Sequence, residues 1–307
     1  MIYGFIKIIV FFSLLLISVS YVLGERFNRK AIYPHNWQYK ETLDKEIRDG
    51  VIEEGYFEAL EKEAFEILSE RGYVLKGYWI QGGDRPTDKT IIICHGITNN
   101  LMKSLKYLEP FIERGYNAVI YDHKNHGESG GDYTTFGVEE KLDLKQIVDY
   151  VVSKVGEAGV IGTHGESMGA ATVLEHVKID PRIAFVISDC AYKSAEAEFA
   201  FRLKVENHLP AFPILNVASL INKMRYGITF KEMSPIRMLE TVDQPILFIH
   251  GLADDYIPYS HSQDMFAVKK DKKALYLVPK ARHAMSIIVD RAAYIDQINQ
   301  FLDRYGF

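Results

Sequence analysis

From residue 90 to the C-terminus, short apolar runs alternate with longer stretches that carry a helical pattern. The apolar runs occupy residues 90–94, 118–121, 159–163, 184–188, 245–250 and 274–278. The helical stretches occupy residues 101–114, 137–154, 168–179, 260–269 and 290–305. Strands that alternate with helices are joined by crossover connections, which make neighbouring strands parallel and put helices on both faces of the sheet. Uninterrupted apolar runs such as TIIIC and PILFI suit strands covered on both faces, so the sequence predicts an α/β fold with a mostly parallel sheet.

Two further segments extend and interrupt this pattern. Residues 64–68 and 73–80 are predicted to be two antiparallel strands with a tight turn at 70–72. Residues 191–230 contain no clear strand, and they hold an amphipathic stretch followed by the proline-bearing run LPAFPILNVASLI. A long insert in a compact sheet domain is usually functional, so we expect a helical lid at about 191–230. A helical excursion that only covers the core is the alternative.

The N-terminus is far more apolar than the rest of the chain. No charge occurs from Ile8 to Leu23, and only Lys7 interrupts the apolar run that precedes them. A membrane span needs about 20 apolar residues, so residues 1–24 are expected to form a single-pass membrane anchor. A signal peptide cleaved near the small residues 18–20, which would leave a secreted protein, is the alternative. Basic residues flank the run on both sides and leave its orientation open.

The remaining chain divides into two parts. Residues 25–63 are polar and mixed, and we expect a connecting or cover segment there. Residues 64–307 are expected to form one domain that contains the lid insert.

Charge and cysteine content exclude several classes of protein. The net charge is −5, and the lysines and arginines form no basic stripe of the kind that nucleic-acid binding requires. The two cysteines, Cys94 and Cys190, lie at the ends of apolar runs and form no CxxC pair. We therefore expect no nucleic-acid partner, no disulfide framework and no zinc site.

One serine lies in a motif with a defined structural context. The motif Gly165-Glu166-Ser167-Met168-Gly169 stands between the strand-like run GVIGTH and a small-residue helix. Gly-x-Ser-x-Gly is a weak signal alone, but between a strand and a helix it describes the nucleophile elbow, which exposes a serine hydroxyl above a sheet. A glycine-rich turn without chemistry is the weaker alternative. We therefore predict that Ser167 is a nucleophile.

A nucleophilic serine needs a base that takes its proton and an acid that orients that base. The loop HGLAD after the strand PILFIH supplies Asp254, and the loop KARHAMS after the last predicted strand supplies His283. The order Ser, Asp, His is the one that the nucleophile-elbow fold uses. Asp255, next to Asp254, and Asp189, after an earlier strand, are alternatives for the acid. We predict a triad of Ser167, Asp254 and His283.

The oxyanion that forms on an attacked carbonyl needs backbone N–H donors. These usually come from the residue after the nucleophile and from the loop after an early strand. Met168 follows the serine directly, and Ile97 lies in the loop HGIT after the strand TIIIC. A tight turn with a strand-end histidine is the alternative for that loop. We predict the amides of Ile97 and Met168 as the two donors.

Several motifs together resemble a known superfamily. They are HGITNN, YDHKNHGESGG, GESMGAAT, HGLADDYIP and ARHAMS, and they span the chain from about residue 64 to the C-terminus. This combination resembles the α/β-hydrolase superfamily, in the branch similar to monoglyceride lipases and serine aminopeptidase-like hydrolases. It is most similar to a group of single-span bacterial α/β hydrolases. Lys124 is a departure, since relatives typically carry arginine there.

The resemblance implies both the fold and the site residues. It implies an α/β-hydrolase fold, the triad Ser167, Asp254 and His283, and the oxyanion donors Ile97 and Met168. In the family pattern, the register set by the following Ile-Pro pair favours the first of the two adjacent aspartates.

The expected reaction is acyl transfer through an acyl-enzyme that water releases, which requires no metal or organic cofactor. The apolar insert and the anchor favour a carboxylic ester with an apolar acyl chain as the substrate. An aminopeptidase-like amide or peptide hydrolase is the alternative. We therefore expect a small-molecule ester or amide and the membrane as partners.

Two other classes of protein are alternatives to a serine hydrolase. A metal-dependent hydrolase would rest on Asp122, His123 and His126 in one loop, but their spacing gives no recognisable metal cage. A non-catalytic binding module on the same fold is the second class, because fold does not imply function. The complete set of triad residues argues against it.

Overall fold

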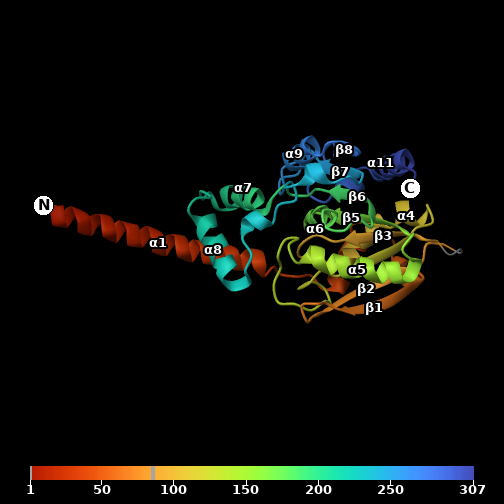
Figure 1. The fold of residues 1–307 in the computed structure, drawn as a ribbon, viewed down its shortest axis with the longest axis horizontal. Coiled ribbons are helices and arrows are strands. Elements are labelled where there is room, and N and C mark those ends of the chain that lie inside the picture. The colour runs from red at the N-terminus through yellow and green to blue at the C-terminus, as the bar shows by residue number, and fades with distance from the viewer. Residues whose placement is uncertain (1, 84–86) are drawn as a thin grey trace.

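The computed structural model describes residues 2–83 and 87–307 (Figure 1). Its described strands form one eight-stranded sheet in the order β1-β2-β4-β3-β5-β6-β7-β8. The strands are β1 (Lys62–Leu68), β2 (Val74–Ile80), β3 (Lys89–Cys94), β4 (Asn117–Tyr121), β5 (Val160–Glu166), β6 (Ile183–Asp189), β7 (Ile246–Gly251) and β8 (Lys273–Val278). β2 pairs antiparallel with β1 and β4, and β3 to β8 pair parallel. Every strand that the sequence predicts is present, and the predicted α/β fold is confirmed.

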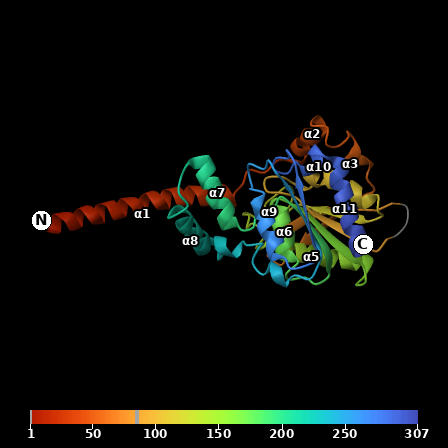
Figure 2. The same cartoon turned by 90° about the horizontal axis from the view of Figure 1, so that it is seen from above.

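Helices cover both faces of this sheet (Figure 2). The α-helices are α1 (Ile2–Ile32), α2 (Tyr39–Arg48), α3 (Tyr56–Ala59), α4 (Glu109–Ile112), α5 (Glu140–Val155), α6 (Met168–His176), α7 (Ala195–Asn207), α8 (Ile214–Tyr226), α9 (Ser260–Val268), α10 (Ser286–Val289) and α11 (Arg291–Tyr305). The 3₁₀ helices are η1 (Leu101–Tyr107), η2 (Phe230–Glu232) and η3 (Leu239–Thr241). One apolar cluster joins the sheet to η1, α4 and α11, and a second joins it to α5, α6 and α9. The buried strands β3 and β4 contribute to both, as expected for a sheet covered on two sides.

The predicted helix at 101–114 differs from the observed structure. The chain forms the 3₁₀ helix η1 and then the short helix α4. Pro110 lies at the start of α4, where a proline is tolerated because the first helical amides need no acceptor. In the interior of one long helix it would remove a hydrogen bond, which explains the interruption.

The insert after β6 forms the two helices α7 and α8, which lie apart from the sheet beside α1 (Figure 1). A third apolar cluster holds this region together, and it includes Ile32, Phe199 and Leu215. The helices therefore share a core with the end of α1 as well as with the sheet domain.

The helix α1 continues past residue 24, where the sequence analysis expects the anchor to end. Its segment Tyr3–Ile32 is long and apolar enough to cross a membrane, a property that a signal sequence would share. Its first part stands away from the rest of the protein, and its last turns pack on α8 (Figures 1 and 2). A Cβ atom at Gly24 would lie 3.1 Å from the Ile214 carbonyl oxygen and 3.1 Å from the Ala218 amide. The glycine at position 24 therefore lets α1 pack closely against α8.

Candidate active site

Ser167 lies in the sharp turn between β5 and α6. Its backbone has φ 57° and ψ −114°, which is a strained conformation for a residue with a side chain. A Cβ atom at Gly165 would lie 2.3 Å from the Gly169 carbonyl oxygen, and one at Gly169 would lie 2.1 Å from that of Cys94. Both glycines are therefore required by close backbone contacts. The turn has the geometry that the sequence motif predicts.

The three predicted triad residues meet at the carboxyl ends of the parallel strands. His283 Nε2 lies 3.0 Å from Ser167 Oγ, and His283 Nδ1 lies 2.8 Å from Asp254 Oδ2. The loops after β5, β7 and β8 bring the residues together, although 116 positions separate the serine from the histidine. This line-up lets the imidazole take a proton from the hydroxyl while the carboxylate orients the ring.

Asp254 is held as a carboxylate by a dense set of donors. Its Oδ1 accepts the amides of Tyr256 and Ile257 at 2.9 and 2.8 Å, and its Oδ2 also accepts from His250 Nε2 at 3.1 Å. Burial by itself would raise the pKa of Asp254, but the hydrogen bonds from His250 and His283 outweigh it and hold the pKa well below its usual range. The charged form that the candidate triad needs is therefore favoured.

The two alternative acids occupy other positions. Asp255 is exposed and forms an ion pair with Arg282 at 2.6 Å. Asp189 is buried, accepts hydrogen bonds from Ser286 and Tyr294, and offers its carbonyl oxygen to the Ser167 amide at 2.8 Å. Asp189 thus forms hydrogen bonds to both the turn at Ser167 and the loop that contains His283. Asp254 is the acid that contacts His283.

The two predicted oxyanion donors flank the serine. Met168 is the first residue of α6, where a helix leaves its N–H groups without intrahelical acceptors. Ile97 lies in the loop after β3, and both residues line the cavity that contains Ser167. Trp37 donates its amide to the Thr98 carbonyl oxygen at 2.9 Å, so the segment after α1 holds this loop in place.

A fully buried ion pair, between Lys106 and Glu166, lies directly beside the turn that contains Ser167. Lys106 Nζ lies 2.5 Å from Glu166 Oε2 and also donates to the Ala284 carbonyl oxygen at 3.1 Å. Tyr107 donates to the same glutamate at 2.6 Å. Burial would raise the pKa of Glu166, but the ammonium of Lys106 lowers it to about 2. Lys106 therefore links the residue before Ser167 with the residue after His283.

The cavity at Ser167 has a volume of about 390 Å³. Its walls come from the loops of the sheet domain, from α7 and from the end of α1. The apolar lining includes Phe27, Ala31, Ile97, Phe136, Tyr192, Phe199 and Ile257. The polar lining includes Lys30, His35, Glu198, Arg202, Glu206 and Tyr256.

The contribution of α1 and of the segment after it to this cavity was not predicted from the sequence. Phe27 and Ala31 are one helical turn apart, and Leu23 precedes them by another turn. This i, i+4, i+8 spacing indicates an apolar helix face that continues past the anchor. The polar residues between them obscured the pattern.

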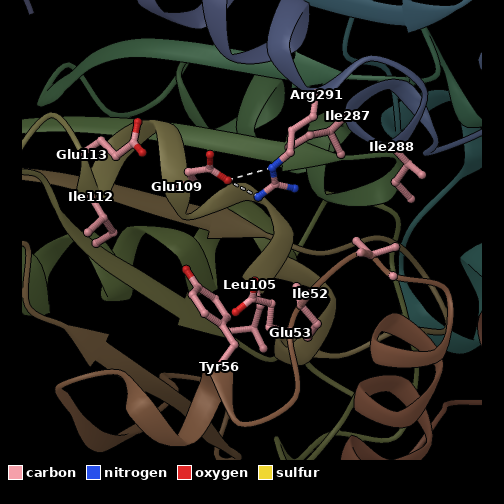
Figure 3. Close-up of a pocket in the computed structure, with 12 residues that line it drawn as sticks. Ile52, Glu53, Tyr56, Leu105, Glu109, Ile112, Glu113, Ile287, Ile288 and Arg291 are labelled. Atoms are coloured by element: carbon pink, nitrogen blue, oxygen red, sulfur yellow. Dashed lines mark hydrogen bonds and ion pairs between the residues drawn. The ribbon is translucent and has the colours of Figure 1, made fainter.

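A second and larger cavity, of about 640 Å³, lies elsewhere, between the segment that follows α2, the helices α4 and α10, and the start of α11 (Figure 3). Arg291 forms an ion pair with Glu109 across it, and Tyr56, Ile52 and Leu105 complete one wall (Figure 3). Its described lining contains no serine, cysteine or histidine, and it shares no residue with the cavity at Ser167. It therefore lacks the serine and histidine that a triad of this kind requires.

The loop considered for a metal is a hydrogen-bonded structural cluster. Asp122 accepts the amides of Leu101 and Glu128 at 2.7 and 2.8 Å, and His126 Nδ1 lies 2.9 Å from the Lys124 carbonyl oxygen. Burial lowers the pKa of His123 to about 3, so this ring is neutral. The hydrogen-bonding atoms of Asp122 and His126 are thus engaged within the fold, whereas His123 Nε2 is buried without a partner among the described residues.

One other group of possible metal ligands includes two of the three triad residues. In the described residues, ligand atoms of Cys190, Asp254 and His283 lie within 4.8 Å of one another. Burial raises the pKa of the Cys190 thiol well above its usual value. Metals bind the thiolate, so a neutral thiol is a poor ligand there.

The sheet order, the serine turn and the cavity above the strands together define a hydrolase with the α/β-hydrolase fold. Residues 15–212 match the model of the family described as X-Pro dipeptidyl-peptidase (S15 family). The chain belongs to this family.

Known proteins are similar to the chain over most of its length. The uncharacterized protein YqkD of Bacillus subtilis is 38% identical over 290 residues, which cover 94% of this chain and 94% of YqkD. The uncharacterized protein YfhR of Escherichia coli (strain K12) is 28% identical over 253 residues, which cover 80% of this chain and 76% of YfhR. The Pyrococcus furiosus esterase Pf2001 has a TM-score of 0.66 at 24% identity, covering 81% of this chain and 95% of the esterase. The structural similarity to this esterase supports the assignment of the α/β-hydrolase fold to this chain.

Proposed function

We propose that the protein is a serine hydrolase that works through an acyl-enzyme formed on Ser167. The observation that carries this proposal is the unbroken line from Ser167 Oγ through the His283 ring to Asp254, with separations of 3.0 and 2.8 Å. Nucleophile, base and orienting acid are the three parts that acyl transfer by a serine requires.

The proposed mechanism assigns one step to each group. His283 accepts the Ser167 proton as the hydroxyl attacks a carbonyl carbon, and Asp254 stabilises the imidazolium that forms. The amides of Ile97 and Met168 donate to the oxyanion. His283 then protonates the leaving group, and a water molecule activated by the same ring releases the acyl group. No metal or organic cofactor takes part in these steps.

We propose a carboxylic ester with an apolar acyl chain as the substrate. The cavity at Ser167 supports this choice, because aromatic and aliphatic side chains make up much of its lining. Burial of apolar surface would favour a longer chain by about 0.8 kcal/mol for each buried CH₂ group. The similarity in fold to an esterase agrees with an ester substrate.

An amide or peptide substrate is the second candidate. The description of the family model as an X-Pro dipeptidyl-peptidase favours it. The same triad chemistry serves both bonds, so the leaving group distinguishes the two candidates.

We further propose that α1 anchors the enzyme in a membrane and that α7 and α8 act as a lid. The apolar length of α1 supports the anchor, and the position of α7 over the cavity supports the lid. Residues 25–63 then connect the anchor to the hydrolase domain at 64–307. Detection of the N-terminal residues in the membrane-bound protein would support an uncleaved anchor, and their loss would support a signal peptide.

Fluorophosphonate labelling of the full-length protein in detergent tests the activated serine. Wild-type protein is expected to be labelled, Ser167→Ala to give no label, and His283→Ala and Asp254→Asn to be labelled much more slowly. Labelling that persists in Ser167→Ala would contradict the proposal, as would folded wild-type protein that stays unlabelled.

Matched substrates then test the bond that is cleaved. An acyl chain-length series of esters is compared with aminoacyl arylamides. Faster turnover of long-chain esters is expected. Cleavage of the arylamides with little ester turnover would favour the second candidate.

A further inference from the structure

The cavity at Ser167 contains two buried polar groups whose hydrogen bonds are incomplete. Glu198 and Arg202 lie one turn apart on α7, and both line the cavity. Glu198 is only 5% exposed, and neither of its carboxyl oxygens has a hydrogen-bond partner among the described residues. Nε of Arg202 is also buried and also has no hydrogen-bond partner among the described residues. Such groups are rare in folded proteins because leaving them unpaired is costly.

The rest of the Arg202 guanidinium is held by its neighbours. One terminal nitrogen donates to the Asp255 carbonyl oxygen at 3.3 Å, and the other pairs with Glu206. The guanidinium also stacks over the Tyr256 ring, 3.8 Å from its centroid. These contacts fix the side chain and leave the Nε–H group without an acceptor.

The two groups lie on the side of the cavity nearest the histidine. The Tyr256 ring lies between Arg202 and His283, with its centroid 4.9 Å from that of the imidazole. His283 delivers a proton to the leaving group in the proposed reaction, so the leaving group must lie on this side. Arg202, with Glu198 one turn away on α7, therefore lies on the side of the cavity where the alcohol portion of an ester would lie.

The combination of groups restricts what chemistry fits. Burial raises the pKa of Glu198 to about 8, so near neutral pH its carboxyl group is protonated, with one oxygen that donates a hydrogen bond and one that accepts. An ammonium group would be repelled by the Arg202 guanidinium and could not accept from its Nε–H group. A carboxylate or a fully ionised phosphate could accept from both residues but would leave the accepting oxygen of Glu198 without a donor. A hydroxyl group accepts from Arg202 Nε–H and donates to the accepting oxygen of Glu198, so it satisfies both residues at once.

We infer that Glu198 and Arg202 form a subsite for a hydroxyl group on the alcohol portion of the substrate. This inference rests on the proposed serine hydrolase function and names the substrate class more closely: an ester of a hydroxylated alcohol. The subsite offers the substrate an acceptor at Glu198 and a donor at Arg202 Nε.

Two esters that differ by one group test the subsite with the full-length protein in detergent. 2-Hydroxyethyl decanoate and propyl decanoate have the same number of heavy atoms, and only the first has a terminal hydroxyl. The wild-type kcat/KM is expected to favour the hydroxyethyl ester by roughly tenfold or more, the range for a hydrogen bond to a charged group.

Glu198→Leu is expected to reduce this preference to near one. Glu198→Gln should keep part of the preference, because its amide still accepts a hydrogen bond. Glu196→Leu is the matched control, because Glu196 is an exposed glutamate on the same helix that does not line the cavity.

Two results would overturn the inference. The first is an unchanged preference in Glu198→Leu. The second is a wild-type preference for the cationic ester 2-(dimethylamino)ethyl decanoate over the hydroxyethyl ester, since it would identify an ammonium site.

A binding measurement separates the subsite from the ester reaction. The stable amides N-(2-hydroxyethyl)decanamide and N-propyldecanamide are added to the Ser167→Ala protein, and the rise in Tm is compared. A larger rise with the hydroxyethyl amide that disappears in Ser167→Ala/Glu198→Leu supports the subsite even if no ester is hydrolysed. Equal rises reject the subsite and leave the proposed hydrolase function standing.

Discussion

The Phe27 ring of α1 meets the Phe199 ring of α7 edge to face, with 5.3 Å between their centroids. Both rings line the cavity that contains Ser167. The helix whose first part is long and apolar thus also supplies a wall of the candidate active site. The segment proposed as an anchor and one wall of the cavity at Ser167 therefore belong to the same helix.

Phe27→Ala should therefore change substrate preference. Removing the ring takes away apolar surface that a long acyl chain would contact, at a cost of about 1 kcal/mol or roughly fivefold in kcat/KM. Turnover of a butyryl ester should change little, because a short chain makes fewer contacts. Phe5→Ala, on the exposed part of α1, is the control. An equal loss on short and long esters would argue against Phe27 as part of an acyl site.

The adjacent aspartates should respond very differently to the same substitution. Asp254→Asn removes the carboxylate that orients His283 and should lower kcat by about 10⁴-fold. Asp255→Asn alters an exposed pair with Arg282 and should leave kcat within about twofold. Steady-state kinetics on one ester measures both. Equal losses in the two variants would contradict the assignment of Asp254 as the acid.

Lys106→Met should destabilise the protein, because it leaves the Glu166 carboxylate buried without its ion pair. Breaking a buried pair costs about 3–5 kcal/mol of unfolding free energy, whereas the half-exposed Lys145→Met should cost less than about 1 kcal/mol. Denaturant titration measures the difference. The double variant Lys106→Met/Glu166→Leu should regain part of the loss, and no recovery would mean that the charge is not the cause.

Glu198 should give the wild-type protein a pH-dependent stability. Burial raises the pKa of Glu198 from 4.5 to about 8, so the folded state binds this proton more tightly than the unfolded state. The stabilising contribution is complete below pH 4.5 and is lost as the pH rises through 8. Glu198→Gln lacks this dependence.

The unfolding free energy of Glu198→Gln relative to wild type should therefore rise by roughly 2 kcal/mol between pH 5 and pH 7. Denaturant titrations at the two pH values measure it. Glu196→Gln, at the exposed position on the same helix, should show no such trend. A difference that stays constant with pH would contradict the raised pKa.

Much of the fold follows from local sequence patterns. Strands such as β3 and β4 are continuous apolar runs between polar turns, so their periodicity and length identify them. The sharp turn at Ser167 was predictable because its two glycines are required by backbone contacts within a few residues of each other and with β3. The motif order then indicated which loops would meet, without giving their distances.

The remaining features depend on contacts between distant segments. Nothing near Glu198 in the sequence indicates that its carboxyl group is buried without a hydrogen-bond partner among the described residues. The roles of His250 and Lys106 depend on residues that the fold brings beside them, such as Asp254 and Ala284. The contact of Phe27 with Phe199 joins residues from two separate parts of the chain, so neither local pattern contains it.

The continuity of α1 has a kinetic consequence for the proposed enzyme. A helix rises 1.5 Å per residue, so Phe27 lies only about 6 Å along the axis beyond Leu23, where the apolar run ends. With α1 in a bilayer, the cavity would be held at the lipid headgroups. The enzyme would then meet its substrate in two dimensions, and its rate would follow the mole fraction of ester in the bilayer. Diluting the ester with an inert lipid at constant total ester would slow the reaction.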